Sequence, residues 1–248
     1  MSQAFIEAKN VWKRYGDNVV LERLSLRIEA GEFCSIVGAS GCGKTTFLRM
    51  LLGEETPDQG QLLLNGAPLP AEPDATRGVV FQRYSVFPHL TVLGNVLLAL
   101  ELKAPLLGRL FGARRRAAGA AALEMLARVG LADAARRYPA ELSGGMQQRL
   151  ALAQSLIAQP RLLLLDEPFG ALDPGIRHDM HELVTALWRE QGLTVVMITH
   201  DIKEGFALGT RLFVFDKVRV DPQAPHAYGS RVTYDLPLNH AAPAVQAA

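Results

Sequence analysis

Apolar and polar residues alternate along the first thirty residues of the chain. Residues 24–28 read Leu-Ser-Leu-Arg-Ile, and residues 18–21 carry a similar half-apolar pattern. A period of two residues is typical of a strand with one buried face. Residues 60–66 form a further apolar run that ends in Asn-Gly, a pair that favours a tight turn. We therefore predict a set of antiparallel strands in the N-terminal part of the chain.

Four later runs are apolar at nearly every position. They cover residues 32–37, 78–81, 162–165 and 194–198. Such runs are typical of parallel strands that are buried on both faces. Each run is followed by residues that can bind a ligand: a glycine-rich segment, Gln82, the pair Asp166 and Glu167, and the pair Thr199 and His200. Because ligands of open α/β sheets collect beyond the carboxyl ends of the strands, we predict one shared site there.

The pattern between Pro88 and Pro160 is helical. Residues 95–102, 117–129 and 146–158 favour helix, and a basic run at residues 114–116 reads as a solvated helix start. We predict a helical subdomain, residues 88–160, inserted in an α/β core. The main domain would then cover residues 1–216. A C-terminal extension, residues 217–248, would hold turns, a strand at 231–236 and a frayed end.

Composition adds few constraints to this picture. The chain has 248 residues, 49% of them hydrophobic, and a formal net charge of +1, so charge gives no indication of a nucleic-acid partner. Two cysteines, Cys34 and Cys42, are too few for a disulfide framework and suit a reducing compartment. No apolar run reaches the roughly 18 residues that span a bilayer, so a membrane role would be peripheral.

The glycine-rich segment fits the phosphate-binding pattern G-x-x-x-x-G-K-[ST]. It lies between a predicted strand and residues 45–52, which favour helix. Glycines let the backbone wrap around a phosphate, and the N–H groups at the helix start face the anion. The Lys44 amine would reach the β- and γ-phosphates, and the Thr45 hydroxyl would bind Mg²⁺. The candidate loop consists of Gly38, Ala39, Ser40, Gly41, Cys42, Gly43, Lys44, Thr45 and Thr46.

The polar residues at the other strand ends suit the same chemistry. Asp166 could hold Mg²⁺, directly or through water, and Gln82 could join it through its amide oxygen. Glu167 could polarise a water molecule aimed at the γ-phosphate, and the His200 imidazole could position that water. Each residue also has an ordinary structural interpretation, as a helix cap, a surface glutamine or a hydrogen-bonded histidine.

A second motif, residues 142–149, places Ser143, Gly144 and Gly145 at the start of a predicted helix. A helix N-terminus of this kind binds anions through its N–H groups, although it could equally be a simple N-cap. One chain would then carry two phosphate-binding surfaces. Either they meet within the chain, or two chains pair head to tail.

The motifs together resemble the ATP-binding subunits of ABC transporters over residues 4–215. The resemblance rests on the order and spacing of the glycine loop, Gln82, residues 142–149, residues 162–169, residues 171–173 and His200. It implies a P-loop ATPase fold with an antiparallel β subdomain and an inserted helical subdomain, and ATP with Mg²⁺ as ligands. It also implies that Tyr15 stacks on adenine and that Gln82 senses nucleotide.

The resemblance further implies catalytic roles. Asp166 is the Mg²⁺ carboxylate, Glu167 the general base and His200 the switch histidine, while Lys44 stabilises charge on the transferring phosphoryl group. Asp173 lies in the loop that links two sites. Ser143, Gly144 and Gly145 contact the γ-phosphate of ATP held by a second copy of the chain, so that two copies enclose two ATP molecules.

A membrane-spanning permease is the expected partner of such a subunit. Its coupling helix would enter a groove beside Gln82, against Tyr84, Val86, Phe87 and Pro88, although these residues could also be ordinary core. Residues 77–82 and 165–173 resemble importers of nitrate, sulfonate and taurine. The chain departs from that branch at residues 153–156, which read Ala-Gln-Ser-Leu, and in its tail, which resembles subunits of urea or guanidine carboxylase systems.

The expected function is ATP-driven import of a small polar solute. The subunit would lie at the cytoplasmic face of the bacterial inner membrane, bound to the permease, in a system with a periplasmic solute-binding protein and without nucleic acid. Two alternatives stay open: the ATPase of an efflux or lipid-trafficking system, and a soluble regulatory, translation or repair ATPase.

Overall fold

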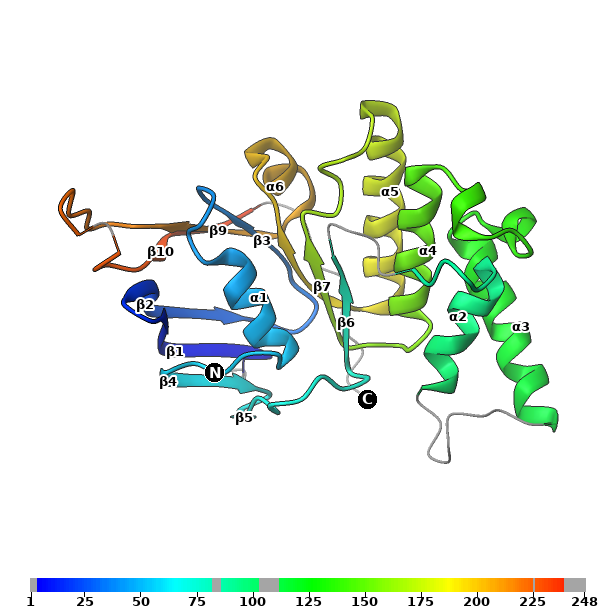
Figure 1. Ribbon diagram of the computed structural model, residues 1–248, viewed down its shortest axis with the longest axis horizontal. Coiled ribbons are helices and arrows are strands. Elements are labelled where there is room, and N and C mark those ends of the chain that lie inside the picture. The colour runs from blue at the N-terminus through cyan, green and yellow to red at the C-terminus, as the bar shows by residue number, and fades with distance from the viewer. Residues whose placement is uncertain (1–3, 82–85, 103–111, 225, 239–248) are drawn as a thin grey trace.

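The computed structural model describes residues 4–81, 86–102, 112–224 and 226–238. Two sheets and a group of helices make up this part of the chain (Figure 1). The first sheet is antiparallel, in the order β2-β1-β4-β5. Its strands are β1 (Ile6–Tyr15), β2 (Asn18–Ile28), β4 (Gln59–Leu64) and β5 (Ala67–Pro68). The predicted antiparallel strands of the N-terminal segment are thereby confirmed.

The second sheet is parallel except for one edge strand, in the order β10-β9-β3-β8-β7-β6. All four apolar runs of the sequence lie in it as neighbouring strands, as predicted. Its strands are β3 (Phe33–Val37), β6 (Arg77–Val80), β7 (Leu162–Asp166), β8 (Thr194–Ile198), β9 (Arg211–Asp216) and β10 (Arg231–Pro237). The antiparallel strand β10 corresponds to the strand predicted at residues 231–236.

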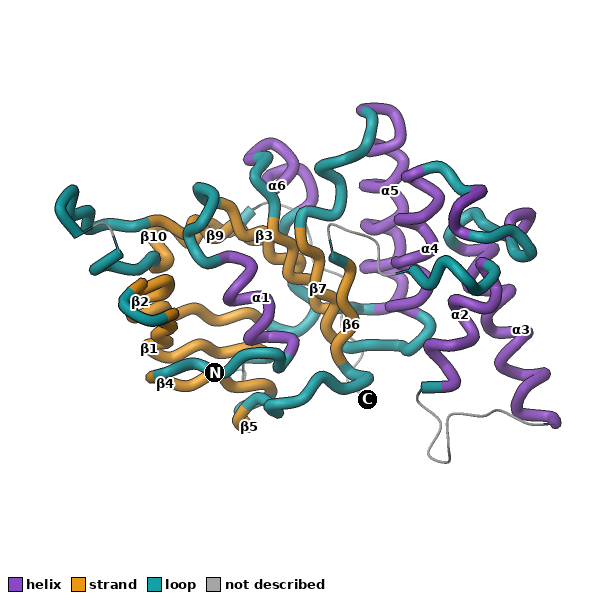
Figure 2. The backbone as a smooth tube through the Cα atoms, in the orientation of Figure 1, coloured by secondary structure: helices purple, strands orange, loops and turns teal. Residues whose placement is uncertain are grey.

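Six α-helices lie in the described ranges, and Figure 2 shows how they group around the second sheet. Three of them, α2, α3 and α4, come between β6 and β7 in sequence. The six helices are α1 (Lys44–Leu52), α2 (Val92–Glu101), α3 (Gly112–Arg128), α4 (Gly144–Leu156), α5 (Pro174–Gln191) and α6 (Ile202–Leu208). Short 3₁₀ turns occupy Ala132–Ala134 and Pro139–Glu141. None of the described helices is long and apolar enough to cross a membrane.

Two of these helices begin earlier than hydrophobic periodicity predicts, because capping residues set their starts. The Thr91 hydroxyl accepts a hydrogen bond from Gly94 N at the start of α2, and the Ser143 hydroxyl accepts one from Met146 N at the start of α4. Such caps satisfy N–H groups that the first turn of a helix leaves without partners.

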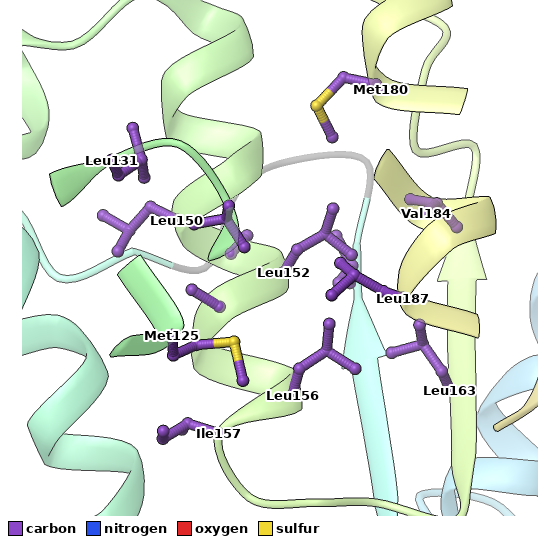
Figure 3. Packing of buried hydrophobic residues seen from close by; sticks show 14 of the residues in the cluster. Met125, Leu131, Leu150, Leu152, Leu156, Ile157, Leu163, Met180, Val184 and Leu187 are labelled. Carbon is purple, nitrogen blue, oxygen red and sulfur yellow. The ribbon is translucent and has the colours of Figure 1, made fainter. Parts of the chain in front are cut away.

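The second sheet separates two hydrophobic cores, and β7 contributes to both. Leu162 and Leu164 point to a core shared with α1 and the antiparallel sheet, whereas Leu163 and Leu165 point to a core shared with α4 and α5. Figure 3 shows the second core, in which side chains from these helices and from α3 converge: Met125, Leu131, Leu150, Leu152, Leu156, Ile157, Leu163, Met180, Val184 and Leu187. Helix α1 therefore lies on one side of the sheet and α4 on the other (Figure 1).

The turn between β9 and β10 lies against β2. Backbone hydrogen bonds join Val19 N to His226 O, Glu22 N to Ser230 O and Ser230 N to Val20 O, at 2.9 to 3.0 Å. The Glu22 carboxylate, which is buried, also accepts a bond from Arg219. This part of the predicted extension thus connects the two sheets.

Candidate functional site

The glycine loop joins β3 to α1 and needs glycine at two positions for a steric reason. At Gly38, whose φ is +154°, a Cβ would lie 2.2 Å from the Phe215 carbonyl oxygen. At Gly43, whose φ is +85°, a Cβ would lie 2.6 Å from a Leu21 methyl group. Other residue types tolerate neither the contacts nor the backbone conformation at Gly43. The loop is therefore a tight turn packed against β2 and β9.

The start of α1 is prepared for an anion. Gly43 is the N-cap of the helix, and no side chain of the described part of the chain caps it, so its first N–H groups keep their capacity to bind. The Lys44 amine donates hydrogen bonds to the carbonyls of Gly38 and Ala39, at 2.8 and 2.9 Å. The Lys44 amine takes part in none of the salt bridges of the described residues, and its side chain folds back onto the carbonyls of the loop. These features suit a phosphate chain.

Asp166, at the end of β7, faces the same helix. Its Oδ1 lies 3.5 Å from the Thr45 hydroxyl, across a separation of 121 residues in the sequence. Burial raises the pKa of the Asp166 carboxyl, and the neighbouring Glu167 charge raises it further. The Asp166 carboxylate and the Thr45 hydroxyl are hard oxygen ligands of the kind that Mg²⁺ prefers, and a cation would offset the repulsion between Asp166 and Glu167. The residues present therefore fit a magnesium ion.

Glu167 and His200 also meet at this edge of the sheet. His200 Nδ1 lies 3.3 Å from Glu167 Oε2, and the two side chains are 65% and 27% exposed, so both can reach a substrate. Glu167 N donates a hydrogen bond to Ile198 O at 2.9 Å, which fixes the residue against β8. The φ of Glu167 is +46°, a left-handed conformation that is uncommon for a residue other than glycine.

Tyr15 lies at the end of β1, beside α1 and within hydrogen-bonding reach of Thr46 in its first turn. Its hydroxyl donates a hydrogen bond to Glu55, and its ring is 48% exposed. Burial of the hydroxyl raises the pKa of Tyr15, and the Glu55 carboxylate raises it further, whereas Thr46 lowers it. The ring thus has an open face at the rim of the loop.

Ser143, Gly144 and Gly145 do not join this cluster. They lie at the start of α4, which packs on the opposite side of the second sheet from α1. Ser143 and Gly144 are exposed there. Two candidate anion-binding helix starts on opposite faces of one sheet favour the head-to-tail pairing of two chains over a meeting within one chain.

The predicted permease contact is described only in part, because Gln82 and Tyr84 lie outside the described residues. Val86 is partly buried against the helical core, and Phe87 is 41% exposed. Phe87 borders a groove of about 320 Å³ between β6, α2 and α4, whose other lining residues include Phe81, Leu98, Leu102 and Gln154. An apolar groove with an exposed phenylalanine at its edge is typical of a docking surface.

Sequence reasoning assigned no role to several residues that support the site. Gln148, on α4, is fully buried and donates a hydrogen bond to Pro168 O, directly after Glu167. Glu204, on α6, is buried and accepts a hydrogen bond from the Thr199 hydroxyl, directly before His200. A polar residue among apolar helix positions is the only sequence signal for Gln148, and it does not identify the partner.

Comparison with known proteins agrees with this geometry. Residues 21–170 match the family described as ABC transporter. The chain is 44% identical over 231 residues to the aliphatic sulfonates import ATP-binding protein SsuB of Pseudomonas putida, covering 91% of this chain and 80% of that protein. It is also 44% identical over 220 residues to the spermidine/putrescine import ATP-binding protein PotA of Chromobacterium violaceum, covering 88% of this chain and 59% of that protein.

A solved structure has the same fold. The dimeric post-hydrolysis state of the ATP-binding cassette MJ0796, bound to ADP and Pi, superposes with a TM-score of 0.76 at 30% identity. The superposition covers 95% of this chain and 99% of the cassette. From the glycine loop, the strand-end carboxylates and these likenesses together, the chain belongs to the ABC transporter family, as one of its ATP-binding, ATP-hydrolysing subunits.

Proposed function

We propose that this chain powers the import of a small polar solute through a separate membrane permease, by binding and hydrolysing ATP. The observation that carries the catalytic part is the convergence of Lys44, Thr45, Asp166, Glu167 and His200 at one edge of the second sheet. The glycine loop and the start of α1 hold the phosphates, and the exposed face of Tyr15 stacks on the adenine.

Glu167 acts as the general base. Its carboxylate accepts a proton from the water molecule that attacks the γ-phosphate, and His200 orients that carboxylate through the 3.3 Å contact. Lys44 leaves the loop carbonyls and donates to the phosphate oxygens, where it stabilises the charge that develops. Thr45 and Asp166, with Gln82, would hold Mg²⁺, which would supply positive charge to offset that of the phosphates.

The active unit is a dimer in which Ser143, Gly144 and Gly145 of one chain complete the site of the other. Their position on the far side of the sheet from α1 supports this arrangement, since they cannot cap the loop of their own chain. The MJ0796 cassette, which shares the fold, is dimeric. Asp173, exposed at the start of α5, would lie between the two sites.

Import, rather than efflux, is supported by the relatives. The names of SsuB and PotA both describe import ATP-binding proteins. SsuB is matched over 80% of its length and PotA over 59%. We propose a sulfonate-, nitrate- or taurine-like solute, a periplasmic binding protein that delivers it, and a location at the cytoplasmic face of the inner membrane.

The Glu167→Gln variant tests the catalytic assignment. Glutamine keeps the size of the side chain but cannot accept the proton, so we expect ATP binding to persist, ATP-dependent dimers to accumulate and turnover to fall by about 10² or more. Size-exclusion chromatography with ATP and a phosphate-release assay measure these effects. Near-normal phosphate release by the variant would show that Glu167 is not the base.

Reconstitution with the permease tests the solute assignment. The complex is placed in vesicles with a candidate periplasmic binding protein, and ATPase activity is measured with sulfonates, taurine, nitrate, urea and polyamines. Stimulation by one of the first three, absent in the Glu167→Gln complex, supports the sulfonate branch. Stimulation by polyamines alone would refute it, and basal activity that no solute changes would favour the regulatory alternative.

A further inference from the structure

Two buried side chains, Thr199 and Glu204, and the partly buried His181 lie next to His200 and link two helices. The Glu204 side chain is 5% exposed. One carboxylate oxygen accepts a hydrogen bond from His181 Nε2 at 2.9 Å, and the other accepts one from the Thr199 hydroxyl at 2.5 Å. Thr199 Oγ1 in turn accepts a hydrogen bond from Asp201 N at 3.1 Å. The residues on both sides of His200 are therefore bonded into one chain that ends on α5, at His181.

His181 also contacts the segment that carries Glu167. Its ring packs against the ring of Phe169, with a centroid distance of 4.7 Å and an interplanar angle of 70°. Phe169 is fully buried and lies two residues after Glu167. One turn earlier on the same face of α5, Arg177 approaches Asp201 at 3.8 Å and donates to Leu172 O at 3.2 Å. Helix α5 thus spans both catalytic segments.

From these contacts we infer that His181 is a positioning residue for ATP hydrolysis. The inference rests on the roles proposed for Glu167 and His200. His181 touches neither the nucleotide nor the water. His181 donates a hydrogen bond to Glu204, and Glu204 in turn orders the Thr199 hydroxyl and the backbone of residues 199–201. Through its ring contact with Phe169, His181 also fixes the position of that segment relative to Glu167. Without this donor a buried carboxylate loses a partner, and the groups around it shift to compensate.

The expected consequence is a loss of catalytic rate without a loss of nucleotide affinity. The glycine loop and Tyr15 do not contact this cluster, whereas a displacement of about 1 Å at a reacting group is enough to lower a rate by up to about 10². We expect His181→Leu to lower kcat about tenfold or more and to leave KM for ATP within about twofold. His181→Gln, whose amide can still donate to Glu204, should restore most of kcat.

The experiment measures steady-state ATPase kinetics and thermal unfolding of the full chain. His178→Leu is the matched control, because this histidine lies on the same helix with its side chain 74% exposed, beside Glu182. Glu204→Gln adds a double-mutant cycle: the double variant should lose no more activity than the more impaired single variant. Because the cycle compares folded variants with one another, a modest loss of stability in one of them does not prevent the comparison.

Three results would overturn the inference. The first is unchanged kcat in His181→Leu, and the second is a rise in KM with kcat preserved. The third is a loss that His181→Gln fails to restore and that follows the drop in melting temperature, which indicates a purely structural role. If Glu167→Gln keeps its activity, the proposed catalytic base is wrong instead, and that outcome is distinct from all three.

Discussion

Replacing Asn95 with alanine should release the segment that presents Phe87 to the groove. Asn95 lies on α2 and is fully buried. Its Oδ1 accepts a hydrogen bond from Phe87 N at 2.7 Å, and its Nδ2 donates to the carbonyls of Phe87, Leu90 and Thr91 at 2.9 to 3.1 Å. A single amide therefore fixes the path of residues 87–91, directly before α2.

The magnitude follows from counting these bonds. Each hydrogen bond contributes about 1 kcal/mol net, and a buried group left without a partner costs somewhat more. Two of the carbonyls keep a backbone partner in the variant, since Phe87 O also accepts from Leu90 N and Thr91 O from Asn95 N. We therefore expect Asn95→Ala to lower the free energy of unfolding by about 3 kcal/mol, and Tm by about 6 to 12 °C for a chain of this size.

Thermal unfolding followed by circular dichroism measures this shift, with Gln154→Leu as the control. Gln154 donates to Asn95 Oδ1 at 3.1 Å and, at the longer distance of 3.4 Å, to Asn95 O, so its loss should cost only about 1 to 2 kcal/mol. Co-purification with the permease should fall further for Asn95→Ala than for the control, because the Phe87 segment is displaced. A Tm for Asn95→Ala that equals the control's would refute the idea that this amide organises the segment.

Three further predictions concern the loop, its thiol and the extension. Gly43→Ala should weaken ATP binding in calorimetry about tenfold or more, because its Cβ would meet Leu21. Gly41→Ala, whose Cβ meets nothing within 4 Å, should lose less. Burial raises the pKa of the Cys42 thiol, so iodoacetamide should label it more slowly at pH 8 than in the urea-unfolded chain, and faster as pH rises; fast labelling at pH 7 would contradict this. Arg219→Ala removes a partner of Glu22 and should increase hydrogen exchange at residues 226–230. Replacing the exposed Arg231 with alanine should not. Equal exchange in both variants would show that the pair of Arg219 and Glu22 does not hold this turn against β2.

The catalytic edge of the sheet was the most predictable part of the protein. Continuous apolar runs predicted the buried parallel strands, and their parallel order brought Asp166, Glu167 and His200 beside the glycine loop because carboxyl ends of parallel strands share an edge. The apolar runs and the polar residues that follow them are both local in sequence. The parallel order of the strands then brings those polar residues to one edge. The roles of the individual residues remain predictions.

The contacts behind the site were not predictable, because they depend on how helices pack. His181 pairs with Glu204 across 23 residues, and Gln148 reaches Pro168 across 20. Neither spacing matches a helical or strand period, so no pattern along the chain indicates these pairs. The start of α2 was missed because Thr91 caps the helix ahead of its apolar stretch, whereas the start of α4 at Ser143 was predicted from its motif.

The position of β7 has a consequence for the order of folding. Its pairing with β6 joins residues about 85 apart in sequence, so loop-closure entropy opposes this contact early in folding. Helices α2, α3 and α4 occupy that interval, and helices form from local contacts well before distant strands pair. Strand β7, whose two faces contribute to two cores, should therefore pair late in folding. Its pairing should complete both cores in one cooperative step. Pulsed hydrogen exchange during refolding would show protection of α4 before β7, and the reverse order would contradict this sequence of events.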